Sequence, residues 1–284
     1  MQEFIALDLK SLWPGDVLPV QLFVRNTTTL SRVLESGEPV TARLLEDLEK
    51  THTAVLVRAE QCRALADYIE FNVIDGRQEC LPAFVVSRLS QIVFNNIDSA
   101  SIESLWRATL QIVHHQHRVP LSAVIACPSV QSAHPWVRRQ LGIAWFMAMI
   151  LTDSKMHEDT VRSGTFAALV HELDVLVDPS IKDLPHTYPS VTLSILARHY
   201  PVDPVVYEML LLYRERIDGS GLPFGYEGHQ VPPLAQYLGL ANWLGTGLTS
   251  PLRDVESKLS RPTETFSVEL VEQAQRLVSE MRTE

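Results

Sequence analysis

The chain has 284 residues and 46% of them are hydrophobic, so it can bury one large core or two modest ones. Its formal net charge of −10 argues against non-specific nucleic-acid binding, because such binding needs a basic surface that neutralises phosphates. The most apolar stretch, Leu141 to Leu151, is shorter than the roughly 20 residues that a membrane-spanning helix needs. We therefore expect neither a nucleic-acid partner nor a membrane span.

The cysteines and the first ten residues indicate the cellular compartment of the protein. Cys62, Cys80 and Cys127 are far apart and form no CxxC pair, which favours a reducing environment over a disulfide framework. The opening residues MQEFIALDLK lack the basic region and apolar run of a secretory signal. These features predict a cytoplasmic protein.

Residues 1–80 read as a small mixed α/β domain. Thr41 is placed to cap a helix that runs to Lys50. Short apolar runs bounded by turn residues predict strands at Phe4–Leu7, Val17–Val24 and Ala54–Val57. No catalytic constellation is found here, so we expect a regulatory or docking role.

From Pro82 onward the pattern becomes helical, which predicts an all-helical domain over residues 81–284. Pro128–Ala133 reads as a loop. The predicted helices are Ile97–His117, Pro135–Leu151, a helix starting at Thr160, Ser190–Arg198, a helix starting at Asp203-Pro204, Val231–Leu248 and Ser267–Met281.

Three histidines, His114, His115 and His117, close the first of these helices. Their spacing puts two imidazoles on one face, but no carboxylate or cysteine stands beside them. We expect a solvated helix end here rather than a metal site.

The stretch Tyr213–Gly228, YRERIDGSGLPFGYEG, closes an apolar helix and opens a glycine-rich turn. Glycine reaches positive φ at little steric cost and proline fixes φ, so this composition predicts a loop of defined shape.

This stretch resembles the signature of the HD-GYP family, His-His-Glu-Arg, one residue, then Asp-Gly-Ser-Gly-Tyr-Pro. Leu222 stands where the family has tyrosine, and Tyr213 and Arg214 stand where it has two metal-ligating histidines. The matching positions are Glu215, Arg216, Asp218, Gly219, Ser220, Gly221 and Pro223. The resemblance covers roughly Pro82 to the end and implies the fold of bacterial metal-dependent phosphodiesterases that hydrolyse cyclic di-guanylate.

Other positions that the resemblance implies for the metal site are partly kept. His134 matches an early histidine ligand and His171 matches the histidine of the family's His-Asp pair, while Glu172 replaces the aspartate. In the same block Asp174 and Val175 replace the glycine and lysine. Two further ligand positions carry Tyr188 and Asn242.

Such a set predicts a degenerate site with no metal and no cofactor. Tyrosine ligates divalent ions poorly near neutral pH, because its ordinary pKa is about 10. Arginine cannot ligate at all. One hypothesis is that Arg214 replaces the metal by pairing with Glu172; the alternative is that Arg214 points to solvent.

The predicted function is therefore a catalytically inactive signalling or protein-interaction module in cyclic di-guanylate pathways. The resemblance implies that the loop Asp218–Pro223 contacts a diguanylate cyclase (GGDEF) domain; alternatively, its turn chemistry only holds two helices in place. Two other functions stay open: a residual metal-dependent phosphodiesterase and a non-hydrolysing cyclic dinucleotide receptor. A second family, the metal-poor HDOD group, lacks the Asp-Gly-Ser-Gly-x-Pro run that favours HD-GYP.

Overall fold

A computed structural model of the whole chain describes residues 4–26, 29–51, 54–74, 76–77, 80–94, 97–177, 188–245, 253–260 and 264–281. It divides into two compact units, Met1–Ile97 with Ser122–Arg138 and Asp98–Leu121 with Arg139–Glu284. These units do not coincide with the ranges 1–80 and 81–284, which stay a prediction about domains. Each unit is described in turn.

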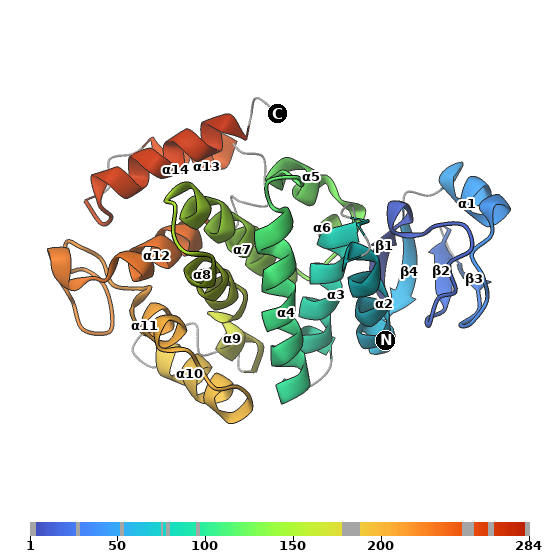
Figure 1. Cartoon of the computed structure of the whole chain (residues 1–284), viewed down its shortest axis with the longest axis horizontal. Coiled ribbons are helices and arrows are strands. Elements are labelled where there is room, and N and C mark those ends of the chain that lie inside the picture. The colour runs from blue at the N-terminus through green and yellow to red at the C-terminus, as the bar shows by residue number, and fades with distance from the viewer. Residues whose placement is uncertain are drawn as a thin grey trace. The chain divides into compact units, whose positions relative to one another are not determined.

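The first unit contains a four-stranded antiparallel sheet of order β1-β4-β2-β3, drawn in blue in Figure 1. Its strands are β1 (Phe4–Asp8), β2 (Leu22–Arg25), β3 (Leu30–Leu34) and β4 (Ala54–Arg58). The predictions of β1 and β4 are confirmed. Strand β3 was not predicted, because four of its five side chains are exposed or half-buried and give no apolar alternation.

The predicted strand Val17–Val24 is wrong in its first half. Val17 forms only an isolated bridge with Pro39, and β2 begins at Leu22. Pro19 lies between them and has no N–H to donate to a sheet ladder, so the chain joins the sheet only after it.

Four helices accompany this sheet. The Thr41 hydroxyl accepts a hydrogen bond from Leu44 N at 3.1 Å, so the predicted capped helix is confirmed. The predicted loop at Pro128–Ala133 is wrong, because Pro128 begins a short helix instead. These helices are α1 (Ala42–Glu49), α2 (Cys62–Ile74), α3 (Leu81–Phe94) and α6 (Pro128–Gln131).

A buried arginine on α3 forms ion pairs with α2. The Arg88 side chain is 1% exposed and forms ion pairs with Asp67, at 2.8 Å, and with Glu70. Its guanidinium also lies over the Phe84 ring. Removal of one partner would leave a buried charge, so this contact fixes how the two helices pack.

The second unit is helical and is built around α8 (Glu158–Val170), which packs against α4, α11 and α12 (Figure 1). Every side chain from Phe166 to Val170 is buried, as is each from Ile143 to Ala148 on α7. The other helices of this unit are α4 (Ser99–His115), α7 (Pro135–Asp153, here from Arg139 on), α9 (Leu173–Val177), α10 (Tyr188–His199), α11 (Pro204–Leu212), α12 (Pro233–Leu244), α13 (Arg253–Leu259) and α14 (Val268–Glu280), and α5 (Leu121–Ala126) lies at the division between the units.

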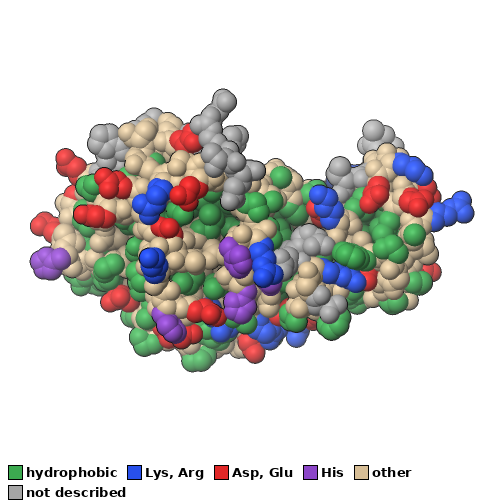
Figure 2. Space-filling model, turned by 45° about the horizontal axis from the view of Figure 1, so that its top comes forward, with side chains coloured by type: hydrophobic (Ala, Val, Ile, Leu, Met, Phe, Trp, Pro, Cys, Tyr) green, Lys and Arg blue, Asp and Glu red, His purple; other side chains and the backbone are tan. Residues whose placement is uncertain are grey.

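The predicted fold class, a mostly helical chain with a small mixed α/β region at its start, is confirmed. Within the described residues, no helix combines the length and the apolar content that crossing a bilayer requires. Figure 2 shows one face of the molecule, on which acidic and basic side chains are interspersed rather than gathered into a single basic surface.

Two helical glycines give a matched test of packing. A Cβ at Gly239 on α12 would lie 2.5 Å from the backbone oxygen of Tyr213, whereas one at Gly164 on α8 would meet the end of the Leu151 side chain. Alanine in a helix is favoured over glycine by about 1 kcal/mol. Steric overlap with backbone outweighs this gain, because overpacking costs about 1–3 kcal/mol and the carbonyl cannot rotate away.

We therefore expect Gly239→Ala to lower the free energy of unfolding by about 2 kcal/mol, and Gly164→Ala to lower it less. Urea denaturation of both variants measures this difference. An unchanged or raised stability of Gly239→Ala would contradict the close approach of α12 to Tyr213.

Candidate functional site

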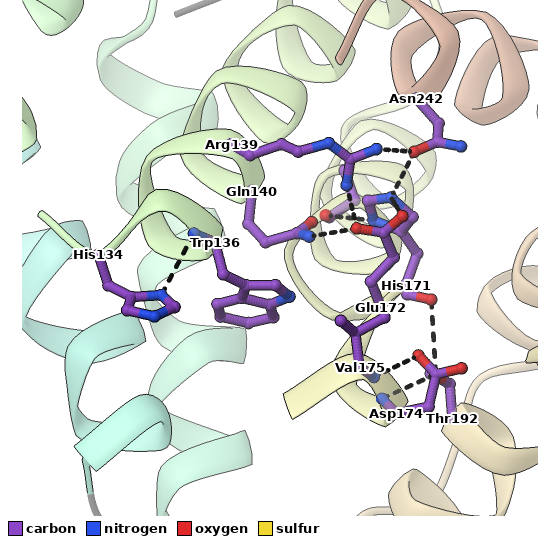
Figure 3. Close-up of polar contacts among 11 residues, drawn as sticks. His134, Trp136, Arg139, Gln140, His171, Glu172, Asp174, Val175, Thr192 and Asn242 are labelled. Atoms are coloured by element: carbon purple, nitrogen blue, oxygen red, sulfur yellow. Dashed lines mark hydrogen bonds and ion pairs between the residues drawn. The ribbon is translucent and has the colours of Figure 1, made fainter. Parts of the chain in front are cut away.

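An arginine joins three segments of the second unit. Arg139 on α7 donates from one guanidinium nitrogen to the Glu172 carboxylate and from another to Asn242 Oδ1 at 2.6 Å (Figure 3). The Gln140 side chain also donates to Glu172, at 3.2 Å. The guanidinium thus lies between the carboxylate that follows α8 and the amide on α12, and its planar fork suits two acceptors at once.

His171 is the C-cap residue of α8 and is buried beside this cluster. Its Nδ1 lies 2.9 Å from the Ala168 carbonyl oxygen, and its Nε2 lies 3.0 Å from Asn242 Oδ1. The ring packs edge-on against Tyr213, with 5.3 Å between centroids. Burial lowers the pKa of His171, and the Arg139 guanidinium adds to this, although the Glu172 carboxylate opposes it.

The structure brings together four of the positions that the resemblance implied for the metal site. His171, Glu172 and Asn242 share hydrogen bonds with Arg139 or with one another, and Tyr213 packs on His171. Arg214 is half-buried next to Tyr213. The arginine seen on Glu172 is Arg139, so a pairing of Arg214 with Glu172 stays a prediction.

Two other implied positions, His134 and Tyr188, are described separately. His134 belongs to the first unit, where its Nδ1 accepts a hydrogen bond from Trp136 N at 3.3 Å and its ring lies edge-on to Phe94. Such a bond satisfies one of the free N–H groups at the start of α7. Tyr188 begins α10, but its side chain lies outside the described part of the structure.

The donor set does not fit a pair of divalent cations. Among the described residues, no three His, Cys, Asp or Glu side chains gather as a metal site would require. Glu172, the one carboxylate in the cluster, already accepts from Arg139 and Gln140. Because a fixed guanidinium repels a metal ion at this distance, the cluster favours an ion pair over metal ligation.

Sequence reasoning missed Arg139 and Gln140. Both stand in a helix that otherwise consists largely of apolar side chains, and Gln140 is fully buried. A polar residue on the inward face of such a helix needs a partner, which was the available signal.

The glycine-rich loop is held from inside by one carboxylate. Glu215 is 1% exposed, and its two oxygens accept from Phe224 N at 2.6 Å and from Tyr226 N at 3.0 Å. Arg216 donates to the backbone oxygens of Tyr213 and Glu215 and lies over the Phe266 ring. Glu215 and Arg216, two of the three charged side chains that match the family pattern, therefore stabilise the loop itself.

Gly221 is required by a close approach. A Cβ at this position would lie 2.2 Å from Arg216 N and 2.4 Å from Glu215 Cα, closer than atoms can approach. The outer part of the loop is different: Asp218 is exposed and accepts from Ser220 N and Ser220 Oγ, which keeps its pKa below its ordinary value. Leu222, Pro223 and Gly219 are half-buried.

An aromatic pair, exposed Phe224 and half-buried Tyr226, extends this surface. The Phe224 side chain is 55% exposed and stacks on Tyr226, with 5.2 Å between ring centroids and an interplanar angle of 22°. The predicted partner surface, Asp218–Pro223, did not include it. An exposed aromatic next to a rigid loop is a feature that partner surfaces use.

The histidines at the end of α4 form no metal cluster with described residues. His114 is about half exposed, and its Nε2 lies 3.1 Å from Glu158. His115 is half-buried and His117 is exposed, so a solvated helix end without a metal site stays a prediction.

No protein-family model matches the chain, and no curated protein matches it. A solved structure that is similar is Bd1817, an HDG"Y"P protein from Bdellovibrio bacteriovorus, with a TM-score of 0.64 over 98% of this chain and 100% of that chain. The protein has an HD-GYP-like fold. Sequence identity to Bd1817 is 14%, so the likeness concerns the fold alone.

Within this HD-GYP-like fold, Asp174 is a buried carboxylate on α9. Its Oδ1 accepts from Val175 N at 3.0 Å, while Oδ2 has no hydrogen-bond partner among the described residues. Burial raises the pKa of Asp174 to about 6. The folded protein therefore favours the protonated carboxyl more than the unfolded chain does.

Substitution of Glu215 tests whether its two hydrogen bonds to loop backbone stabilise the protein. Glu215→Gln keeps the size but leaves one oxygen for two backbone N–H groups, and its amide N–H would face a donor. We expect a loss of about 1–3 kcal/mol in the free energy of unfolding. Glu227→Gln, on an exposed residue of the same loop, is the control and should change stability by less than about 0.5 kcal/mol.

The pKa of Asp174 gives a pH prediction. Because the folded pKa lies above the unfolded value of about 4, the protonated form stabilises the protein at low pH and this stabilisation is lost as pH rises through about 6. Asp174→Asn removes the titration. The free energy of unfolding of Asp174→Asn minus that of wild type should therefore rise by about 1–3 kcal/mol between pH 4.5 and pH 7.5.

Denaturant unfolding of both proteins across this pH range measures the effect. Asp254→Asn, which removes an exposed carboxylate, controls for loss of charge alone. A stability difference between Asp174→Asn and wild type that does not vary with pH would contradict the prediction.

Proposed function

We propose that this protein is a catalytically inactive HD-GYP-like protein that works as a protein-interaction module in cyclic di-guanylate signalling. The observation that carries the proposal is the position of Arg139. Its guanidinium binds the two oxygens, on Glu172 and Asn242, that the resemblance implies as metal ligands. In this proposal, the covalently attached guanidinium takes the place that the family gives to metal ions.

Charge supports this reading of the cluster. A two-metal phosphodiesterase site holds four positive charges with several carboxylates and neutral imidazoles. The described cluster has one carboxylate, one buried imidazole and two amides, those of Gln140 and Asn242, together with a permanent guanidinium. Hydrolysis would need a metal-bound water, and these residues have no free carboxylate with which to bind the metal.

The glycine-rich loop supports a binding role. Glu215 and Gly221 fix its backbone, so Asp218, Ser220 and Phe224 are presented on a rigid frame. Rigid presentation lowers the entropy that binding costs. We propose that a GGDEF domain is the partner, as the family resemblance implies.

The metal-loss proposal is tested on protein isolated without chelator. We expect well below one manganese, iron or zinc per chain by elemental analysis, and no hydrolysis of cyclic di-guanylate with added manganese or iron. Arg139→Ala should lower the free energy of unfolding by about 3 kcal/mol, because Glu172 loses its cation while still largely buried. Arg138→Ala, on the neighbouring residue, is the matched control and should cost less.

Two bound metal ions together with turnover would overturn the proposal. Loss of stability in wild type on treatment with chelator would do the same, because it would show that a metal holds the fold.

The partner proposal is tested by calorimetry against a panel of purified GGDEF domains. Phe224→Ser should weaken a measured interaction at least about tenfold, since exposed aromatics at an interface contribute about 1–3 kcal/mol or more. Tyr207→Ser, on an exposed aromatic of α11, is the control and should leave affinity unchanged. Binding of cyclic di-guanylate in the presence of chelator, with no binding of any GGDEF domain, would instead identify a non-hydrolysing receptor.

A further inference from the structure

The glycine-rich loop presents two stacked aromatic rings on a fixed backbone. The rings of Phe224 and Tyr226 lie 5.2 Å apart between centroids, and the Phe224 side chain is 55% exposed. The backbone N–H groups of both residues donate to the buried Glu215 carboxylate, which holds this part of the chain in place. An exposed ring held in this way can receive a group from a partner at a low cost in entropy.

The same loop contains two carboxylates that face each other. Asp218 and Glu227 are paired across an antiparallel bridge, and both are exposed. The Glu227 side chain lies against Gly219, where an added Cβ would be 2.9 Å from Glu227 Oε1. Like charges directly opposite each other across two strands are destabilising. This arrangement therefore becomes more favourable when a cation lies near both carboxylates.

The carboxylates are close enough to act on whatever covers the aromatic pair. Glu227 is three residues from Phe224. A separation of three residues spans at most about 11 Å between Cα atoms, close to the Debye length of about 10 Å in 0.1 M salt. From Ile217 to Gln230 the sequence has no lysine or arginine. The preceding Arg216 donates inward to two backbone oxygens, so the loop's own arginine does not cover its exposed carboxylates.

We propose that the partner surface that covers Phe224 is basic and places an arginine on the aromatic pair. A guanidinium can stack on a ring and donate to a carboxylate, whereas an ammonium is more strongly hydrated. Its charge also offsets the repulsion between Asp218 and Glu227. This inference rests on the proposed interaction function and adds the chemistry of the partner's surface.

The first experiment uses ¹⁹F NMR of the full chain labelled with 3-fluorotyrosine. Tyr226 reports on the loop, and Tyr207 on α11 reports on an exposed tyrosine of another element. Each signal is assigned by its loss in Tyr226→Phe or Tyr207→Phe. The probe is an acetylated and amidated Arg-Gly-Arg peptide, and matched peptides carry lysine, citrulline or glutamate in place of both arginines. Citrulline keeps the shape of arginine without its charge.

We expect the arginine peptide to shift the Tyr226 signal saturably, with at least about tenfold higher affinity than the citrulline peptide. The lysine peptide should bind with intermediate affinity, and the glutamate peptide should not bind. Equal affinities of the arginine and citrulline peptides, no saturable shift of Tyr226, or an equal shift of Tyr207 would each overturn the proposal.

Variants assign the affinity to the loop. Asp218→Asn and Glu227→Gln keep the size and one acceptor oxygen, and each should lower affinity for the arginine peptide about threefold. Phe224→Ser should lower it about tenfold. Glu272→Gln removes an exposed carboxylate from α14 and is the matched control for loss of charge. A loss of affinity in Glu272→Gln as large as in the loop variants would overturn the proposal.

Calorimetry with the GGDEF panel separates this inference from the proposed function. For every domain that binds, affinity should fall at least about tenfold when salt is raised from 50 mM to 500 mM, and in the double variant Asp218→Asn with Glu227→Gln. A bound domain that responds to neither change would overturn this inference and leave the proposed function intact. If no domain binds, the proposed GGDEF partner is wrong, and the peptide series decides this inference by itself.

Discussion

The helical unit depends on one half-buried contact, the guanidinium of Arg139 between Glu172 and Asn242. Through it, α7, the segment after α8, and α12 meet around a single positive charge. Each of the three side chains is largely removed from water. Loss of one would therefore leave a charge or a polar group without its partner in a poorly solvated place, which is unfavourable. A guanidinium suits this position because it is always charged and presents several donors in one plane.

The loop after α11 illustrates how a sequence pattern can persist for structural reasons. Glu215 accepts two backbone hydrogen bonds of the loop, and Gly221 lies against backbone atoms where no Cβ fits. These contacts are independent of the Arg139 cluster. A match to the Asp-Gly-Ser-Gly-x-Pro run therefore indicates the shape of the loop and carries no information about hydrolysis. The side chains that remain exposed at its tip, Asp218 and Phe224, are the ones free to meet a partner.

Prediction from sequence succeeded where local chemistry is strong. The cap at Thr41 and the Asp203-Pro204 start of α11 satisfy free N–H groups within a few residues, so their effect does not depend on the rest of the fold. Strand β3 and helix α6 were missed or misassigned, because a mostly exposed edge strand and a four-residue helix give no periodic signal. The site was half foreseen: the resemblance named Glu172 and Asn242, while the arginine seen between them is Arg139.

The sequence by itself determined the helical character of most of the chain and the shaped loop at Asp218–Pro223. Both follow from spacing and residue type, which act locally, whereas the departures from a metal-binding pattern at Tyr213 and Asn242 are what the family resemblance implies. Only the tertiary structure decided which cation meets Glu172 and which buried polar atoms stay without a partner. Arg139 and Glu172 are 33 residues apart, and Gln116 and Thr152 are 36 apart. Such contacts depend on how whole helices pack, because a side chain's partners across a core are set by the crossing of its helix with others.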